Sequence, residues 1–313
     1  MPLSIFGFRA LWSPYYALSL LIVVALYFLI TVKWRHKFEN STALSRKQAT
    51  LFITGIIFMY ILKGSPVDLL GHILFTVHMV QMAGLLLLVA PILLMGIPNW
   101  IWENLFKIKV IDALFRFFTK PLIAVFAFGL LFSAYHYPYI LDNVKLSLIG
   151  HAVFTATVFM SAVFFWWPVV NTVKGQPKVH GLKKIGYVIL SAILITPACT
   201  LIIFGDTAIY STYTDGEAWL QAMALCVPAG TLAGLSGMGI SGPEVFTSMS
   251  ALYDQQLGGI LMKVAQELIY VFVIGKIFFA WAAEERNNAE EITRQELLKH
   301  EALHATHAKH ANL

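Results

Sequence analysis

The chain has 313 residues, of which 58% are hydrophobic and 12% are charged, and its mean hydropathy is +0.72. This composition excludes a soluble globular protein of this size and indicates an integral membrane protein. The net charge of +5 does not indicate nucleic-acid binding, because the basic residues are divided among short loops between apolar runs. The two cysteines, Cys199 and Cys226, are far apart in the chain and predict neither a disulfide scaffold nor a paired thiolate metal site.

Apolar runs of membrane-spanning length alternate with short polar loops. The first run follows a single charge, Arg9, precedes the basic stretch KWRHK and has no small-residue cleavage site after it. We therefore expect it to remain as a membrane helix and not to be removed as a targeting signal. The pattern predicts an all-α polytopic bundle of seven transmembrane helices, at about residues 14–33, 48–63, 71–96, 120–137, 146–170, 184–204 and 259–282.

Lysine and arginine predict the orientation of this bundle. If the N-terminus is outside, most of the 22 basic residues lie in inner loops, and the outer ones are Arg9, Lys63, Lys145 and Lys263. We therefore predict a multi-pass protein of the bacterial plasma membrane with the N-terminus outside and the C-terminus in the cytoplasm. Residues 1–282 form the predicted transmembrane domain, and residues 283–313 form a charged cytoplasmic tail.

The segment 205–258 separates the sixth predicted helix from the seventh. It contains no lysine or arginine, and its acidic residues are Asp206, Asp215, Glu217, Glu244 and Asp254. We expect it to fold as an extracytoplasmic cap whose negative charge attracts cations or a basic partner.

The third predicted helix, GHILFTVHMVQMAGLLLLVAPILLMG, carries an unusual group of side chains in its first half: His72, His78, Met79, Gln81 and Met82. At about 100° per residue, the two imidazoles and the two thioethers share one face of a helix. These side chains suit soft or borderline metals, copper above all. Imidazoles inside an apolar helix are costly without a partner, so this group favours metal binding, with methionine packing as the alternative.

Other predicted helices place polar groups at the same outer level. His136 closes the fourth helix, His151 opens the fifth with Thr155 one turn deeper, and Asp254 and Gln255 precede the seventh. His136 and His151 fit headgroup-level hydrogen bonding equally well, and Asp254 equally fits a helix cap. We predict metal ligands at His72, His78, Met79, Met82, His136 and His151, supported by Asp254, Gln255, Thr155 and Gln81.

From about residue 14 to 282 the chain resembles the CtaG family of bacterial cytochrome c oxidase assembly factors, described from Bacillus and its relatives. The resemblance rests on the order of HILFTVHMVQMAG, YHYP, FFWWP and DQQLGG. It implies a seven-spanning plasma-membrane protein of the respiratory chain that is not an enzyme. Its partners would be subunits of a caa-type haem-copper oxidase, which it helps copper to reach.

The positions that match the family pattern are His72, His78, Met79, His136, Pro138, His151, Asp254, Gln255, Gly258 and Gly259. Two positions depart from it. Many relatives have further histidines where this chain has Thr155 and Thr157, so a metal site in this chain would depend more on methionine ligands. Many have an aromatic residue where this chain has Lys263, and that cation disfavours a nearby copper ion unless it points away or pairs with Asp254.

The sequence therefore predicts a copper-binding metallochaperone in which Cu(I) is favoured, because imidazole and thioether ligands hold it with moderate affinity and release it by exchange. His72 would receive copper from an extracytoplasmic donor, and His78, Met79 and Met82 would hold it for an oxidase subunit. Two alternatives stay open. The histidines suit a membrane oxidoreductase that binds haem or quinone, and the chain also suits a metal-free assembly scaffold.

Overall fold

The computed structural model describes residues 3–237, 242–243 and 246–311, so Glu244 of the predicted cap lies outside the described residues. The described secondary structure is entirely helical, which confirms the predicted all-α class. The helices are η1 (Leu3–Phe6), α1 (Gly7–Trp12), α2 (Pro14–Phe28), the π-helical turn η2 (Leu29–Lys33), η3 (Arg35–Lys37), α3 (Arg46–Gly64), α4 (Pro66–Ile73), α5 (Phe75–Ala83), the π-helical turn η4 (Gly84–Val89), α6 (Ala90–Gly96), α7 (Asn99–Leu105), α8 (Lys109–Phe118), α9 (Pro121–Tyr135), α10 (Pro138–Lys145), α11 (Leu148–Val170), α12 (Lys183–Ile203), η5 (Ser211–Tyr213), α13 (Gly216–Met223), α14 (Ala229–Gly237) and α15 (Ala251–Ala311).

Local sequence signals account for several helix starts. Proline stands in the first turn of α2, α4, α9 and α10, where its missing N–H costs no helical hydrogen bond. Helix α3 begins with a capping box, because the Ser45 side chain accepts the Gln48 N–H and the Gln48 side chain bonds the Ser45 backbone in return. These signals place the helix ends in the polar connections.

Five helical segments of the described chain are long and apolar enough to cross a membrane, and seven if each of two bent helix pairs is one span. The predicted count of seven is therefore the upper value. The five segments are Leu3–Lys33, Phe75–Gly96, Leu148–Val170, Lys183–Ile203 and Ala251–Leu298, and the bent pairs are α3 with α4, at 44°, and α8 with α9, at 71°.

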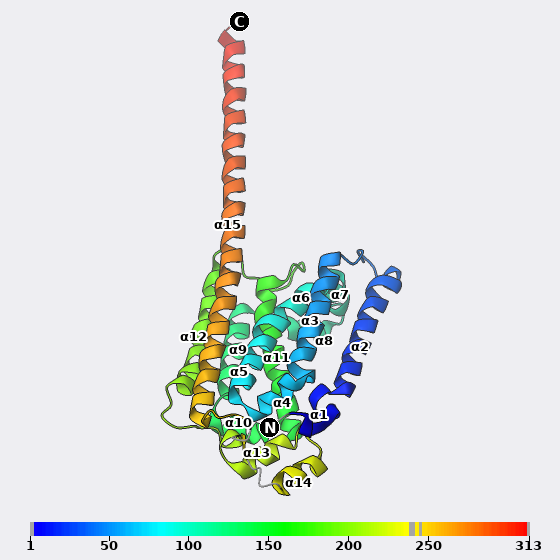
Figure 1. Ribbon diagram of the computed structural model, residues 1–313. Coiled ribbons are helices and arrows are strands. Elements are labelled where there is room, and N and C mark those ends of the chain that lie inside the picture. Colours follow the sequence, from blue (N-terminus) through cyan, green and yellow to red (C-terminus); the bar gives the residue numbers. More distant parts are fainter. Residues whose placement is uncertain (1–2, 238–241, 244–245, 312–313) are drawn as a thin grey trace.

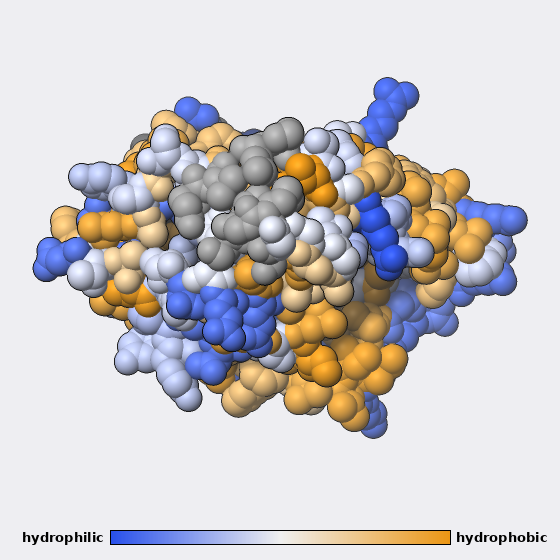
Figure 2. All heavy atoms as spheres, turned by 60° about the horizontal axis from the view of Figure 1, so that its bottom comes forward, coloured by the Kyte–Doolittle hydropathy of each residue, from blue (hydrophilic) through white to orange (hydrophobic). Residues whose placement is uncertain are grey.

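The two ends of the bundle differ (Figure 1). Helices α10, α13 and α14 lie at one end together with the N-terminus, and we call this the α13 end. The connection between α2 and α3 lies at the opposite end, from which α15 extends far beyond the bundle. Figure 2 turns the α13 end towards the viewer and shows hydrophilic and hydrophobic residues side by side on it. Which end faces outward stays a prediction.

The predicted continuous helix 71–96 is interrupted. Leu74 is extended, with φ −120° and ψ 128°, so that His72 lies on α4 and His78 lies on α5. The expected arrangement of both imidazoles on one face of a single helix is therefore wrong. The interruption leaves the first N–H groups of α5 without partners inside the helix, and a group from elsewhere has to bind them.

Asp254, in the first turn of α15, provides that group. Its carboxylate accepts the backbone N–H of Phe75 at 2.6 Å and of Thr76 at 3.1 Å, and its backbone oxygen accepts the Thr76 hydroxyl at 2.8 Å. Gly258, one turn later, allows the close approach, because a Cβ there would lie 2.9 Å from a ring carbon of Phe75. Asp254 thus joins the start of α15 to the start of α5.

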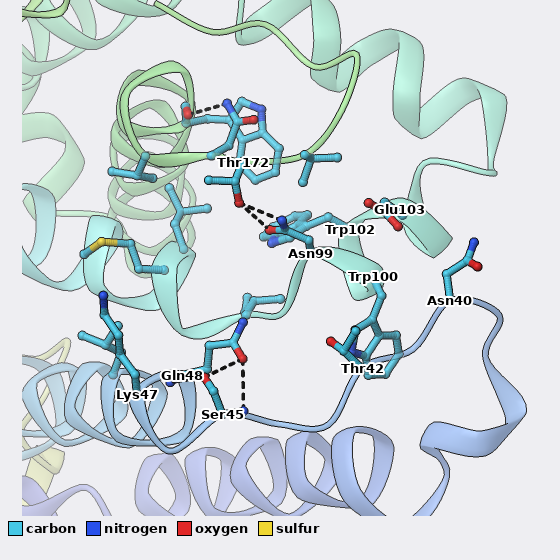
Figure 3. Close-up of a pocket in the computed structure, with 18 residues that line it drawn as sticks. Asn40, Thr42, Ser45, Lys47, Gln48, Asn99, Trp100, Trp102, Glu103 and Thr172 are labelled. Atoms are coloured by element: carbon cyan, nitrogen blue, oxygen red, sulfur yellow. Dashed lines mark hydrogen bonds between the residues drawn. The ribbon is translucent and has the colours of Figure 1, made fainter. Parts of the chain in front are cut away.

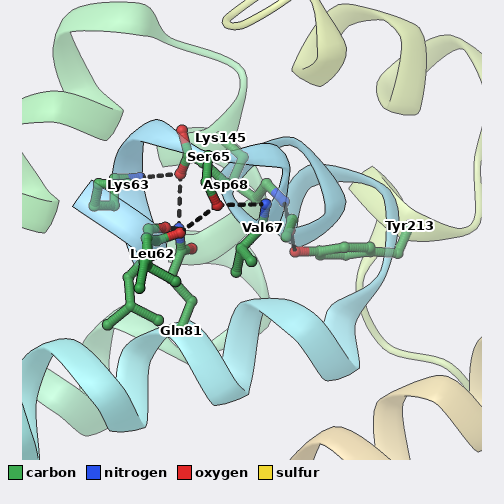
Figure 4. Close-up of polar contacts among 10 residues, drawn as sticks. Leu62, Lys63, Ser65, Val67, Asp68, Gln81, Lys145 and Tyr213 are labelled. Carbon is green, nitrogen blue, oxygen red and sulfur yellow. Dashed lines mark hydrogen bonds and ion pairs between the residues drawn. The ribbon is translucent and has the colours of Figure 1, made fainter. Parts of the chain in front are cut away.

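Lys145 provides a second polar link at the α13 end (Figure 4). The sequence predicts Lys145 among the outer basic residues. The fold buries it, and its ammonium group donates to the Tyr213 hydroxyl at 2.6 Å. The Tyr213 hydroxyl donates in turn to the backbone oxygen of Gly71 at 2.8 Å. Burial lowers the pKa of Lys145 to about 7. The pair connects α10 and η5 to α4.

The Asp254 contact predicts a loss of stability in Asp254→Ala. Two charge-assisted hydrogen bonds to otherwise unpaired N–H groups are removed, so the free energy of unfolding should fall by about 2–3 kcal/mol. Asp206→Ala, at an exposed acidic position, is the control and should change it by less than about 0.5 kcal/mol. Unfolding of the purified protein in detergent measures both, and equal stability of the two variants would contradict the capping role of Asp254.

The buried Lys145 predicts a pH dependence of stability. Its pKa of about 7 in the folded chain is below the ordinary value of 10.5, so the unfolded chain binds the additional proton between these values and stability rises with pH there. In Lys145→Met this contribution is absent. The melting temperature of the wild type should therefore increase relative to the variant between about pH 7 and about pH 10. Lys109→Met, at an exposed position, should keep the wild-type slope, and parallel slopes in all three proteins would be the contrary result.

Candidate metal centre

The four predicted histidines come together at the α13 end as two pairs. The rings of His72 on α4 and His151 on α11 have centroids 5.2 Å apart. The rings of His78 on α5 and His136 at the end of α9 have centroids 5.8 Å apart. His72, His78 and His136 are buried, and His151 is partly exposed. Each pair joins two helices that are distant in sequence.

The His78–His136 pair presents two nitrogen atoms without partners. The Nδ1 atom of His136 lies 2.8 Å from the backbone oxygen of Phe132, and because a carbonyl only accepts, Nδ1 carries the hydrogen. The lone pair of the neutral ring is then on Nε2. The Nε2 atoms of both His78 and His136 are buried and have no hydrogen-bond partner in the described part of the chain. Metal-binding histidines commonly show this arrangement, with one nitrogen bonded to a carbonyl and the other free.

Met79 and Met82 lie in the main hydrophobic cluster, with exposed fractions of 0% and 2%. The same cluster contains Phe132 and Tyr135, whose rings contact His136. On α5, Met79 directly follows His78 and Met82 lies one helical turn further on, so both thioethers are close to His78 along the helix. Packing alone accounts for their burial, and as soft ligands they suit the same ions as the imidazoles.

Three of the residues predicted to support the site, Asp254, Gln255 and Gln81, form hydrogen bonds to backbone groups. Asp254 caps α5, as described above, and Gln255 accepts the N–H of Ile209 at 2.8 Å and donates to the oxygen of Ile202 at 3.1 Å. The Thr155 hydroxyl lies next to the Tyr135 hydroxyl, and neither has a hydrogen-bond partner within the described chain. Asp254 and Gln255 join the start of α15 to other segments at this end.

Lys263 does not pair with Asp254 in the described chain. Its ammonium group pairs with Glu267 at 2.9 Å and donates to the Thr196 hydroxyl at 3.2 Å. The fully buried cation at the histidine end of the bundle is Lys145.

Asp68, His72 and Cys226 form a third group, which the sequence analysis missed. One potential ligand atom from each residue lies within 4.8 Å of the others. Asp68 and His72 are four residues apart on α4, and this spacing was a local signal that both face one side of a helix. Cys226 follows α13 and has no local signal, because only the packing of α13 against α4 brings it here.

The Asp68 carboxylate is held by two further side chains (Figure 4). Its Oδ1 atom accepts the Lys63 ammonium at 2.5 Å and the Gln81 amide at 2.7 Å, and the Gln81 amide also donates to the backbone oxygen of Leu62. Gln81, predicted beside the copper ligands, thus orients Asp68. Burial raises the pKa of the Cys226 thiol to about 12, so the thiol is protonated at neutral pH unless a cation binds it.

A cavity of about 560 Å³ lies at the opposite end of the bundle (Figure 3). The Asn99 amide and the Thr172 hydroxyl bond each other in its wall, which also contains Lys47, Trp100 and Glu103. Neither histidine nor cysteine is among the residues that line it. The histidine pairs and the Asp68, His72 and Cys226 group lie instead at the α13 end.

Residues 25–284 match a family described as cytochrome c oxidase caa3 assembly factor (Caa3_CtaG). Comparisons with curated proteins and with solved structures gave no significant match. The matched range contains both histidine pairs and the Asp68, His72 and Cys226 group. Since the match covers most of its length, the chain belongs to the cytochrome c oxidase caa3 assembly factor family.

Proposed function

We propose that this protein binds copper at the α13 end and helps to deliver it to a haem-copper cytochrome c oxidase during assembly. Family membership supports the oxidase assembly role. The copper part of the proposal rests on one observation. The rings of His78 and His136 are neighbours, and the buried Nε2 atom of each has no hydrogen-bond partner within the described chain. An unpartnered buried nitrogen costs about 1–3 kcal/mol, and a bound ion would remove that cost.

The surroundings favour Cu(I) as the cargo. A monovalent ion carries less charge into an apolar site than a divalent one, and its desolvation is less costly. Imidazole nitrogen and thioether sulfur are ligands that suit Cu(I), and Met79 and Met82 lie in the same cluster as the rings that contact His136. A site of two imidazoles with neighbouring thioethers binds less tightly than a thiolate pair, which suits a carrier that has to release its ion.

The route to this pair begins at His151. It lines an open hollow of about 320 Å³ together with Tyr16, Lys63 and Thr155, and its ring lies against that of His72. In this proposal an extracytoplasmic donor delivers copper to the His72–His151 pair, and the ion then moves to the His78–His136 pair. The α13 end faces outward from the plasma membrane, where an oxidase subunit docks and takes the ion.

The double variant His78→Ala, His136→Ala tests this function. It should lose most of the copper that copurifies with the wild type and lower oxidase activity in cells, because both nitrogen ligands are removed, while the protein still accumulates in the membrane. Elemental analysis and oxidase assays measure the two effects. His180→Ala, at an exposed position, is the control and should match the wild type.

Unchanged copper content in the double variant would refute the copper proposal. If oxidase activity were also unchanged, the metal-free scaffold would be the better account. A Soret absorption band in the purified wild type would favour the haem alternative.

The double variant Met79→Leu, Met82→Leu tests the thioethers. Leucine keeps the approximate volume of methionine, so stability should change by less than about 1.5 kcal/mol at each position. Affinity for Cu(I) should fall about tenfold, which corresponds to about 1.4 kcal/mol, and competition with a chromogenic Cu(I) chelator measures it. Met160→Leu, on the exposed side of α11, is the control. Unchanged affinity would assign Met79 and Met82 to packing alone.

A further inference from the structure

We propose that Asp68, His72 and Cys226 form a second metal site, for a divalent cation of the Zn²⁺ class, separate from the His78–His136 pair. The three residues offer a carboxylate, an imidazole and a thiol whose ligand atoms lie within 4.8 Å of one another. A tetrahedral Zn²⁺ site with ordinary bond lengths places its ligand atoms about 3.3–3.8 Å apart, so shifts of about 1 Å close this group around an ion.

Apolar packing holds the cysteine in place. Cys226 lies between Met223 and Val227, which are both buried in a cluster with Leu69 and Ile73 of α4. Asp68 and His72 belong to the same helix as those two apolar residues. The contact that brings α13 to α4 is therefore the contact that brings the thiol to the carboxylate and the imidazole.

Two of the donors have free positions. His72 has an exposed fraction of 3%, and its Nδ1 atom has no hydrogen-bond partner within the described chain. Both bonds to the Asp68 carboxylate go to Oδ1, from Lys63 and Gln81, and among the described residues Oδ2 receives none. Partners that fix one oxygen of a ligating carboxylate are typical of the outer surroundings of metal sites.

The mixture of ligands selects the class of cation. Thiolate, imidazole and carboxylate together suit Zn²⁺, whereas a carboxylate is a poor ligand for Cu(I). Lys63 offsets the charge of Asp68, so the thiolate that forms on binding balances one of the two positive charges of the ion. Three protein ligands leave a fourth position for water or for a group that exchanges with it.

An ion can reach this group from the surface. Cys226 is only partly buried, and it lines an open hollow of about 460 Å³ between the loop after α13 and the start of α2. Arg9 also lines this hollow, where its guanidinium group lies over the Tyr15 ring. A cation bound here occupies His72, which in the function proposed above receives copper, so this second site would regulate access to the copper pair.

Co²⁺ is the probe that tests the site, because it replaces Zn²⁺ and its absorption reports a thiolate ligand. Purified full-length protein with added Co²⁺ should show a sulfur-to-cobalt charge-transfer band and the visible bands of a tetrahedral ion. Cys226→Ser should abolish the charge-transfer band, and Asp68→Asn should weaken Co²⁺ binding at least about tenfold. Cys199→Ser changes the other cysteine and is the matched control, with a spectrum that should equal that of the wild type.

A wild type without the charge-transfer band, or a Cys226→Ser variant that keeps it, would overturn the proposal. A second measurement covers poor folding of Cys226→Ser. In Cys199→Ser, where Cys226 is the remaining cysteine, Zn²⁺ should slow maleimide labelling of Cys226 at least about tenfold. A labelling rate that is the same with and without Zn²⁺ would also overturn the site.

The same variants can refute the copper site and the Zn²⁺ site independently of each other. The His78→Ala, His136→Ala variant should keep the cobalt spectrum, because it leaves all three proposed ligands in place, and loss of the spectrum there would overturn the separation of the two sites. Copper content of the same variant tests only the copper pair.

Discussion

The contact between the Asp254 carboxylate and the start of α5 joins α15 to α5 and caps the helix that carries His78. Helix α5 begins inside an apolar bundle, where free N–H groups find no water, and Asp254 binds the first two of them. Asp254 binds N–H groups that a continuous helix would pair internally, so the contact stabilises the bend at Leu74. The bend directs His72 and His78 to different partners, and the same contact fixes α15 against α5.

Buried polar groups at the α13 end fall into two kinds. The first kind is fully bonded and joins helices: Lys145 binds Tyr213, and Gln255 binds two backbone groups. The second kind has no hydrogen-bond partner within the described chain, and it includes the Nε2 atoms of His78 and His136 and the hydroxyls of Tyr135 and Thr155. An unpartnered buried polar atom costs stability, and this cost is the reason for proposing a bound ion at the His78–His136 pair.

The two candidate sites at the α13 end offer different kinds of potential ligand. The His78–His136 pair lies in the apolar core near thioethers, which suits a soft monovalent ion. The group of Asp68, His72 and Cys226 lies nearer the surface and includes a carboxylate that Lys63 partly neutralises, which suits a divalent ion. Two sites with different preferences within one region would let the protein bind copper and respond to another cation.

Hydropathy alone indicated a helical membrane protein, because the energy of burying apolar helices depends on composition along each run. The cost of imidazoles in such a run likewise marked His72 and His78, and the predicted helix ends placed His136 and His151 at the same level. The order of motifs indicated the family that the match over residues 25–284 establishes. Hydropathy, histidine positions and motif order are all properties of the sequence itself, so they can be determined without the folded structure.

The partners of those side chains depend on packing between distant segments, which periodicity does not report. Only the folded chain pairs His78 with His136 and brings Cys226 to Asp68. The start of α5 after the bend at Leu74 is capped by Asp254, which lies 179 residues beyond Phe75 in the chain. Helix periodicity predicts the face on which a side chain lies, whereas its neighbours across the bundle are set by how the helices pack.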